Sequence, residues 1–167
     1  MTIITIGPGA IDRSSQGVPA WTQVSKTNPA TEAGIIDTVE IWAVTNLAGV
    51  VVASFFIVSG NNLSTRGYVN IGDVPAGSKQ VFTGLSLAVQ PGDYIGMYCT
   101  AGMIETGTPA GGGRWYKPGN YIPCTNVAFY YTSLSDYSLY GSGSTGRGAV
   151  KHICRSTGAG IGVGIFD

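Results

Sequence analysis

Hydrophobic and polar residues alternate with a period of two over much of the chain, most clearly between Val74 and Cys99. The apolar members of this alternation are Val81, Leu85, Leu87 and Val89 in a first run, and Ile95, Met97 and Cys99 in a second. Alternation of this kind, bounded by Pro and Gly, predicts two half-buried β-strands.

The corner between the two runs, Gln90-Pro91-Gly92-Asp93, predicts more than a hairpin. Pro followed by Gly suits a type II turn, which splays two strands instead of matching their twist. The apolar residues of both runs all have odd residue numbers, so a two-residue turn at Pro91-Gly92 would not explain the pattern as well as a change of sheet does. We therefore expect an arch, in which the chain leaves one sheet and enters the facing one, so that both apolar sets point into a shared core. We expect Val39, Ile41, Phe55 and Ile57 in the same core.

Short apolar runs recur along the rest of the chain, and no long segment keeps a helical period. The further predicted strands are Thr2–Ile6, Thr38–Val44, Val50–Val58, Arg66–Ile71, Met103–Glu105, Val127–Tyr131, Tyr137–Tyr140, Ala149–Cys154 and Ile161–Phe166. Together with the first two runs, these number nine without the two short candidates Thr2–Ile6 and Met103–Glu105. They lie between Gly- and Pro-rich turns and predict an all-β sandwich or barrel.

Two segments do not fit a simple sandwich strand. Residues 1–36 have little alternation beyond the first strand, so we expect an irregular N-terminal segment or arm, followed by a β-sandwich domain over 37–167. The run Val50–Val58 is apolar on both faces, which requires a cover on both sides. The second cover is either the N-terminal segment or a partner chain.

Charge is scarce. Only 11% of the 167 residues are charged, with nine basic and nine acidic side chains, against about 25% in typical soluble domains. Such a surface favours association, and we expect burial against other subunits; a surface rich in Ser, Thr and Gly is the alternative. The balanced charge speaks against nucleic acid as a partner. No apolar run reaches the ~20 residues of a membrane helix, and no secretory signal is visible.

The cysteines and the lone histidine form no close-spaced metal motif. Cys99, Cys124 and Cys154 read as buried thiols of a protein made in a reducing cytoplasm, although a Cys99–Cys124 disulfide is an alternative. With His152 they would complete a Cys3His set, but the usual close cysteine pair is absent. We expect no metal and no cofactor.

No pattern of catalytic residues stands out. Gly141-x-Gly143-x-x-Gly146 matches a dinucleotide fingerprint in letters only, because no helix follows it, so we expect a turn there. Asp93 is best explained as a turn former. The other carboxylates near predicted strands, Glu40, Asp73 and Glu105, cannot be paired from sequence for glycosidase chemistry. The sequence therefore predicts a protein that is not an enzyme.

The aromatic segment around Trp115, Tyr116 and Tyr121 is the most suggestive stretch for binding. Aromatic side chains on loops beside Gly, Asn and Lys are typical of subunit contacts and of surfaces that stack on sugars. Internal packing is the third reading. We take these three residues as candidate contacts for a glycan or a protein partner.

Residues 74–99 resemble phage and virus-like β-sandwich modules. The resemblance rests on Val74-x-Ala76-Gly77 and on Leu85-x-Leu87-x-Val89-x-Pro91-Gly92-Asp93-Tyr94-Ile95-Gly96-Met97-Tyr98. It implies the jelly-roll topology of capsid, decoration and fibre proteins. Similar corners occur in complement-type and tumour-necrosis-factor-like trimers. The resemblance covers about 25 residues and transfers no binding residues.

These observations predict an antiparallel jelly-roll sandwich that serves as a non-enzymatic structural protein of a virion, made in the host cytoplasm. Its expected partners are copies of itself, with a trimer suggested by the resemblance, or capsid proteins. The alternative is a carbohydrate-binding module for adhesion or receptor recognition. The first predicts large subunit interfaces, and the second predicts an exposed aromatic site on a monomer.

Overall fold

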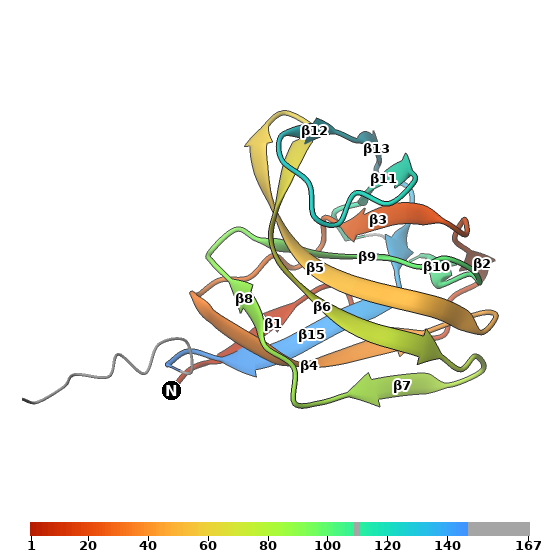
Figure 1. Cartoon of the computed structure of the whole chain (residues 1–167), viewed down its shortest axis with the longest axis horizontal. Helices are drawn as coiled ribbons and strands as arrows, with labels where there is room; N and C mark the ends of the chain where they lie inside the picture. The colour runs from red at the N-terminus through yellow and green to blue at the C-terminus, as the bar shows by residue number, and fades with distance from the viewer. Residues whose placement is uncertain (109–110, 147–167) are drawn as a thin grey trace, which may run out of the picture.

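The chain folds into strands joined by turns, and two of these strands are 13 residues long (Figure 1). The computed structural model describes residues 1–108 and 111–146. Its strands are β1 (Ile3–Ile6), β2 (Ser15–Gln16), β3 (Trp21–Ser25), β4 (Gly34–Trp42), β5 (Leu47–Ser59), β6 (Asn62–Val74), β7 (Lys79–Phe82), β8 (Leu87–Val89), β9 (Tyr94–Tyr98), β10 (Glu105–Gly107), β11 (Arg114–Pro118), β12 (Val127–Ala128), β13 (Tyr130–Thr132), β14 (Asp136–Tyr137) and β15 (Leu139–Ser144). The described residues contain no helix, which confirms the all-β prediction.

Two large antiparallel sheets face each other in a sandwich-like arrangement. One sheet has the order β1-β15-β4-β7, with β8 also paired to β4, and the other has the order β12-β6-β5-β9-β3-β11-β13. A small third sheet, β14-β10-β2, lies at one end. The main core fills the space between the large sheets and includes Val39, Ile41, Leu87 and Met97, each fully buried.

The arch at Pro91-Gly92 is confirmed. Strand β8 pairs with β4 in the first sheet, whereas β9 lies between β5 and β3 in the second. Leu87 and Ile95, on opposite sides of the corner, meet in the same core. Because the chain changes sheets at the corner, its two strands contribute opposite walls of that core.

The seven-stranded sheet curls until it nearly closes into a barrel (Figure 1). Its two edge strands, β12 and β13, are consecutive in the chain and separated only by Phe129. The curled sheet encloses a second core that includes Val24, Leu63, Trp115 and Phe129. The strand count left open a sandwich or a barrel, and a jelly-roll sandwich was expected; the curled sheet depends on how β12 and β13 pair with strands distant in sequence.

The two apolar faces of β5 are covered by the chain itself. Val52 points into the main core and Phe55 into the second core. The expectation that Phe55 and Ile57 share the main core is therefore wrong. Ile57 and Val58 lie near the tip of the β5–β6 hairpin and are 39% and 46% exposed. No partner chain is needed to cover the middle of this strand.

The N-terminal segment is more regular than expected. Residues Ile3–Ile6 form the predicted first strand, paired with β15, and Trp21–Ser25 form β3, an interior strand of the seven-stranded sheet between β9 and β11. The expectation of an irregular segment over 1–36 is wrong for Trp21–Ser25, whereas the strand expected near Thr2–Ile6 is present. Strand β3 pairs with β9 on one side and with β11 on the other. A local sequence pattern does not reveal that a strand has two such partners.

Val81 corrects a second expectation, because it is 51% exposed and lies outside the core. It belongs to β7, whereas Leu87 belongs to β8, and the two strands pair with different parts of β4. Between them Gly84 adopts a φ of 73°, so the alternation is reset between the two strands.

The glycine-rich stretch from Gly141 is a strand and not the expected turn. Residues Leu139–Ser144 form β15, which lies between β1 and β4. A Cβ on Gly143 would lie 1.9 Å from the carbonyl oxygen of Ile35, so only glycine fits there. The predicted strands Ala149–Cys154 and Ile161–Phe166 lie outside the described residues.

Candidate functional site

Trp115, the first candidate contact, is a core residue. Its side chain is fully buried in the second core. The indole nitrogen donates a hydrogen bond to Oδ1 of Asn61 at 2.9 Å, and the Tyr94 ring lies edge-on with centroids 5.0 Å apart. The expectation that Trp115 is exposed on a loop is wrong, so its side chain offers no binding surface.

Tyr121 also belongs to the second core in part. Its half-buried ring packs edge-on against Phe129, with centroids 6.1 Å apart. The ammonium of Lys117 lies 5.2 Å from the centre of the Tyr121 ring. Of the three candidates, only Tyr116 points to the opposite side of β11, away from the second core.

Tyr116 is the centre of an aromatic strip formed with Trp21 and Tyr130. Tyr116 lies directly opposite Tyr130 across β11 and β13, while Pro118 lies opposite Trp21 across β11 and β3. Directly paired residues share a sheet face, so the three rings lie on one face of three adjacent strands. Trp21 and Tyr116 are stacked, with centroids 5.6 Å apart and planes at 13°. The Tyr116 and Tyr130 centroids are also 5.6 Å apart.

The aromatic strip is most exposed at Tyr130. Trp21 and Tyr116 are half-buried, and Tyr130 is 59% exposed. At the buried end the strip enters a cavity of about 270 Å3. The residues that line this cavity are Val18, Trp21, Gln23, Arg114, Tyr116 and Tyr137. The arrangement offers flat apolar surface together with polar groups from a guanidinium, an amide and a phenol.

Arg114 is the cation of the cavity. Its guanidinium carbon lies 4.8 Å from the centre of the Tyr137 ring, and its buried Nε has no hydrogen-bond partner. Burial raises the pKa of Tyr137, and the Arg114 charge opposes part of that rise. The ion pairs found within residues 1–108 and 111–146 join Arg66 to Asp93 and Lys79 to Glu40, so none neutralises Arg114.

Asp136, the neighbour of Tyr137 in the chain, is committed to the fold. It is fully buried and accepts hydrogen bonds from Ser25 Oγ at 2.9 Å, Thr27 Oγ1 at 2.6 Å and the Gly111 amide at 2.8 Å. Arg13 lies close enough for Asp136 and Glu105 to raise its pKa, although burial lowers that pKa more. No local sequence signal marked Asp136, because its partners come from distant segments.

The four carboxylates singled out in the sequence are each engaged by the fold. Asp93 pairs with Arg66, and Glu40 lies 3.2 Å from Lys79. Glu105 accepts a hydrogen bond from the Arg13 amide at 2.6 Å, and Asp73 accepts one from the Gly49 amide at 3.1 Å. Their hydrogen bonds are accounted for by local strands and turns.

Metal-ligating side chains do not gather within the part of the chain that the structure describes. Cys99 is a buried free thiol of the main core, and burial raises its pKa. Cys124 is also free and packs against the second core, so these two thiols do not form the alternative disulfide. His152 and Cys154, the other members of the considered Cys3His set, lie outside the described residues.

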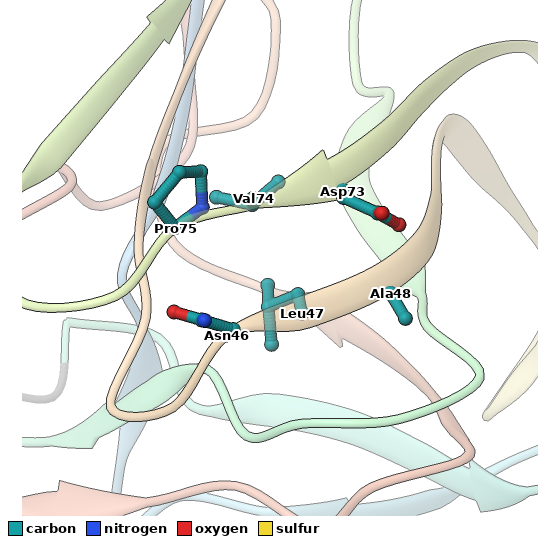
Figure 2. Close-up of a pocket in the computed structure, with 6 residues that line it drawn as sticks. All are labelled: Asn46, Leu47, Ala48, Asp73, Val74 and Pro75. Atoms are coloured by element: carbon teal, nitrogen blue, oxygen red, sulfur yellow. The ribbon is translucent and has the colours of Figure 1, made fainter.

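A second hollow, of about 260 Å3, lies where β5 begins and β6 ends. Figure 2 shows Asn46, Leu47 and Ala48 on one side, and Asp73, Val74 and Pro75 on the other. Its polar groups already serve the turns, since Asn46 Oδ1 accepts a hydrogen bond from the Ala76 amide at 2.9 Å. This hollow has neither an aromatic ring nor a cation in its lining, so the aromatic strip with its cavity is the better candidate site.

No helix long and apolar enough to cross a membrane occurs among residues 1–108 and 111–146. Comparison of the chain with protein-family models, with curated proteins and with solved structures finds no match.

Proposed function

We propose that this chain is a non-enzymatic recognition module of a virion, of the fibre type, that binds carbohydrate through the aromatic strip. The observation that carries the carbohydrate part is the row Trp21, Tyr116 and Tyr130, which leads from open surface into a cavity. The C–H face of a sugar ring is apolar and its hydroxyls are polar, so a site for it combines flat rings with a few polar groups.

The virion part of the proposal is supported by the resemblance of residues 74–99 to phage and virus-like modules. Jelly-roll topology, virion localisation and non-enzymatic character all belong to this proposal. The structure changes the balance between the two original hypotheses. Because the chain covers both faces of β5 itself, the main reason to expect a large subunit interface is weaker. We therefore favour the carbohydrate-binding hypothesis more than the sequence alone did.

A glycan array probed with the purified chain tests the carbohydrate part. We expect binding that falls about five-fold or more in Tyr130→Ala, since truncating an interface anchor costs about 1 kcal/mol or more. Tyr68→Ala is the matched control, because Tyr68 is 50% exposed on β6, away from the strip. An array without hits, or equal losses in both variants, would overturn the proposal.

A second candidate function, a self-associating structural subunit, is favoured by exposed apolar side chains on other strands. Val81 on β7, Tyr68 on β6, and Ile57 and Val58 near the hairpin tip are all between 39% and 51% exposed. In a chain with so little charge, these side chains would be covered in a homo-oligomer or on a capsid. A fibre subunit can have both properties, because the strip and these residues lie on different strands.

A further inference from the structure

We infer that the cavity beside the aromatic strip binds the anionic group of an acidic saccharide, with Arg114 as the specificity-determining residue. This inference rests on the proposed carbohydrate function and adds the charge class of the sugar. It starts from Arg114, whose Nε is buried without a hydrogen-bond partner while its side chain lines the cavity.

An arginine in this position favours an anion. A guanidinium presents five donors in a planar fork that matches carboxylate and sulfate oxygens, and such charge-assisted hydrogen bonds are stronger than neutral ones. Leaving a buried donor unpaired is unfavourable, because its hydration is lost and not replaced. An acidic ligand that reorients the guanidinium would recover part of this cost, whereas a neutral sugar offers only weaker acceptors.

The surrounding charges do not compete for this role. Asp136 is buried and already accepts three hydrogen bonds, from Ser25, Thr27 and Gly111. Lys117 is on β11, as Arg114 is. Its ammonium nitrogen lies 5.8 Å from the centre of the Tyr130 ring and adds a second positive charge near the strip. Arg114 lines the cavity and Lys117 lies beside the strip, so two cations are available there while the Asp136 carboxylate is occupied by its own hydrogen bonds.

The size of the cavity limits the ligand to one unit. Its volume of about 270 Å3 is at or below the lower end of the about 300–1,000 Å3 typical of sites for drug-sized ligands. One acidic sugar would occupy it, with the outer face of the stacked Trp21–Tyr116 pair against its apolar face and the exposed Tyr130 beneath the next unit. We infer binding of a terminal or branch-point acidic sugar.

The test uses the intact chain on an array that holds neutral, carboxylated and sulfated glycans. We expect hits among the carboxylated or sulfated glycans, at least about ten-fold weaker in Arg114→Gln, as expected when one charge-assisted contact is removed. Lys79→Gln removes a charge from β7 in the other large sheet, away from the cavity, and should change binding by less than about two-fold. Comparison of the carboxylated with the sulfated glycans shows whether the bound anion is a carboxylate or a sulfate.

The variants also distinguish the failure of this inference from that of the proposed function. Hits confined to neutral glycans, or acidic hits that Arg114→Gln leaves unchanged, would overturn the role of Arg114 while the carbohydrate function stands. An array without any hits would overturn both. A denaturant unfolding curve of Arg114→Gln that matches the parent shows that lost binding is not lost folding. If this variant is destabilised, Arg114→Lys keeps the charge without the planar fork, and unchanged acidic selectivity there would count against the inference.

Discussion

Leu87 and Val81 show how far an alternating pattern can be trusted at the scale of one residue. Both occupy the apolar face of the same predicted run, yet Leu87 is fully buried and Val81 is 51% exposed. The difference arises at Gly84, where the chain leaves β7 before entering β8. Alternation predicts the face of a side chain only within one uninterrupted strand.

Truncating each of these side chains measures the difference. Leu87→Ala should lower the free energy of unfolding by about 2–5 kcal/mol, because it removes buried methyl groups and leaves a cavity in the main core. Val81→Ala should change it by about 0.5 kcal/mol or less. Chemical denaturation of both variants is the measurement. Equal losses would contradict the burial described for β7 and β8.

Tyr137 carries a pH-dependent contribution. Burial raises its pKa above the ordinary value of about 10. Below that pH both states keep the phenol proton; above it the unfolded chain releases the proton while the folded chain retains it. Stability should therefore fall with rising pH by up to about 1.4 kcal/mol per unit.

This alkaline loss should be smaller in Tyr137→Phe than in the parent chain. Denaturation curves between pH 9 and pH 11, roughly one unit to either side of the ordinary tyrosine pKa, provide the measurement. Tyr68→Phe, at an exposed tyrosine, is the control. A parent-like slope in Tyr137→Phe would show that other groups account for the pH dependence.

At the scale of elements, the arch is held by Asp93. The Asp93 carboxylate pairs with the Arg66 guanidinium on β6, including a 3.0 Å contact to Nη2, and accepts a hydrogen bond from the Gln90 amide at 2.8 Å. The Asp93 carbonyl oxygen accepts a hydrogen bond from the Ala30 amide at 2.8 Å. One buried residue thus connects the corner, β6 and the segment that leads into β4.

Replacing this carboxylate should weaken the fold. Asp93→Asn should cost about 1–3 kcal/mol of unfolding free energy, because it leaves Arg66 without its charged partner in a mostly buried setting. Arg66 is 32% exposed, so water limits the loss. Glu40→Gln, in the more exposed pair with Lys79, should cost about 0.5 kcal/mol or less. If the two variants lost equal stability, Asp93 would have no special role at the corner.

At the scale of the whole molecule, the curled sheet decides which surfaces remain for partners. Its closure buries Trp115 and Phe55 in the second core, so the chain itself uses much of the apolar surface that suggested an interface. Among the residues that the structure describes, the partly exposed strip on β3, β11 and β13 and separate exposed apolar side chains such as Val81 on β7 remain. These two surfaces correspond to the two proposed functions.

Light scattering of the purified chain tests the second of them. If exposed apolar residues mediate association, the parent should be an oligomer, and Val81→Lys should weaken it about ten-fold or more, as a charge within an apolar contact does. Ser86→Lys adds the same charge at an exposed polar position and should leave association unchanged. A parent chain that stays monomeric at all accessible concentrations would count against the self-associating subunit.

The candidate site shows how much sequence reasoning could find. Tyr116 was selected from the aromatic segment, and Tyr130 fell on a predicted strand. Trp21, by contrast, lay in a segment expected to be irregular, and Arg114 was only a neighbour of the aromatics. The strip exists because the pairing register places residues 21, 116 and 130 on one face. Nothing in the local spacing of these residues encodes that register.

The sequence by itself determined the features that depend on neighbours along the chain. Alternation established the buried faces around Val39, Leu87 and Ile95, and Pro91-Gly92 with its flanking pattern established the arch, because strand faces and turn types are local properties. Only the tertiary structure decided the interior place of β3, the burial of Trp115 and the position of Arg114 beside Tyr137. These depend on which distant strands pair and in what register, and that choice is made by the burial of the whole chain.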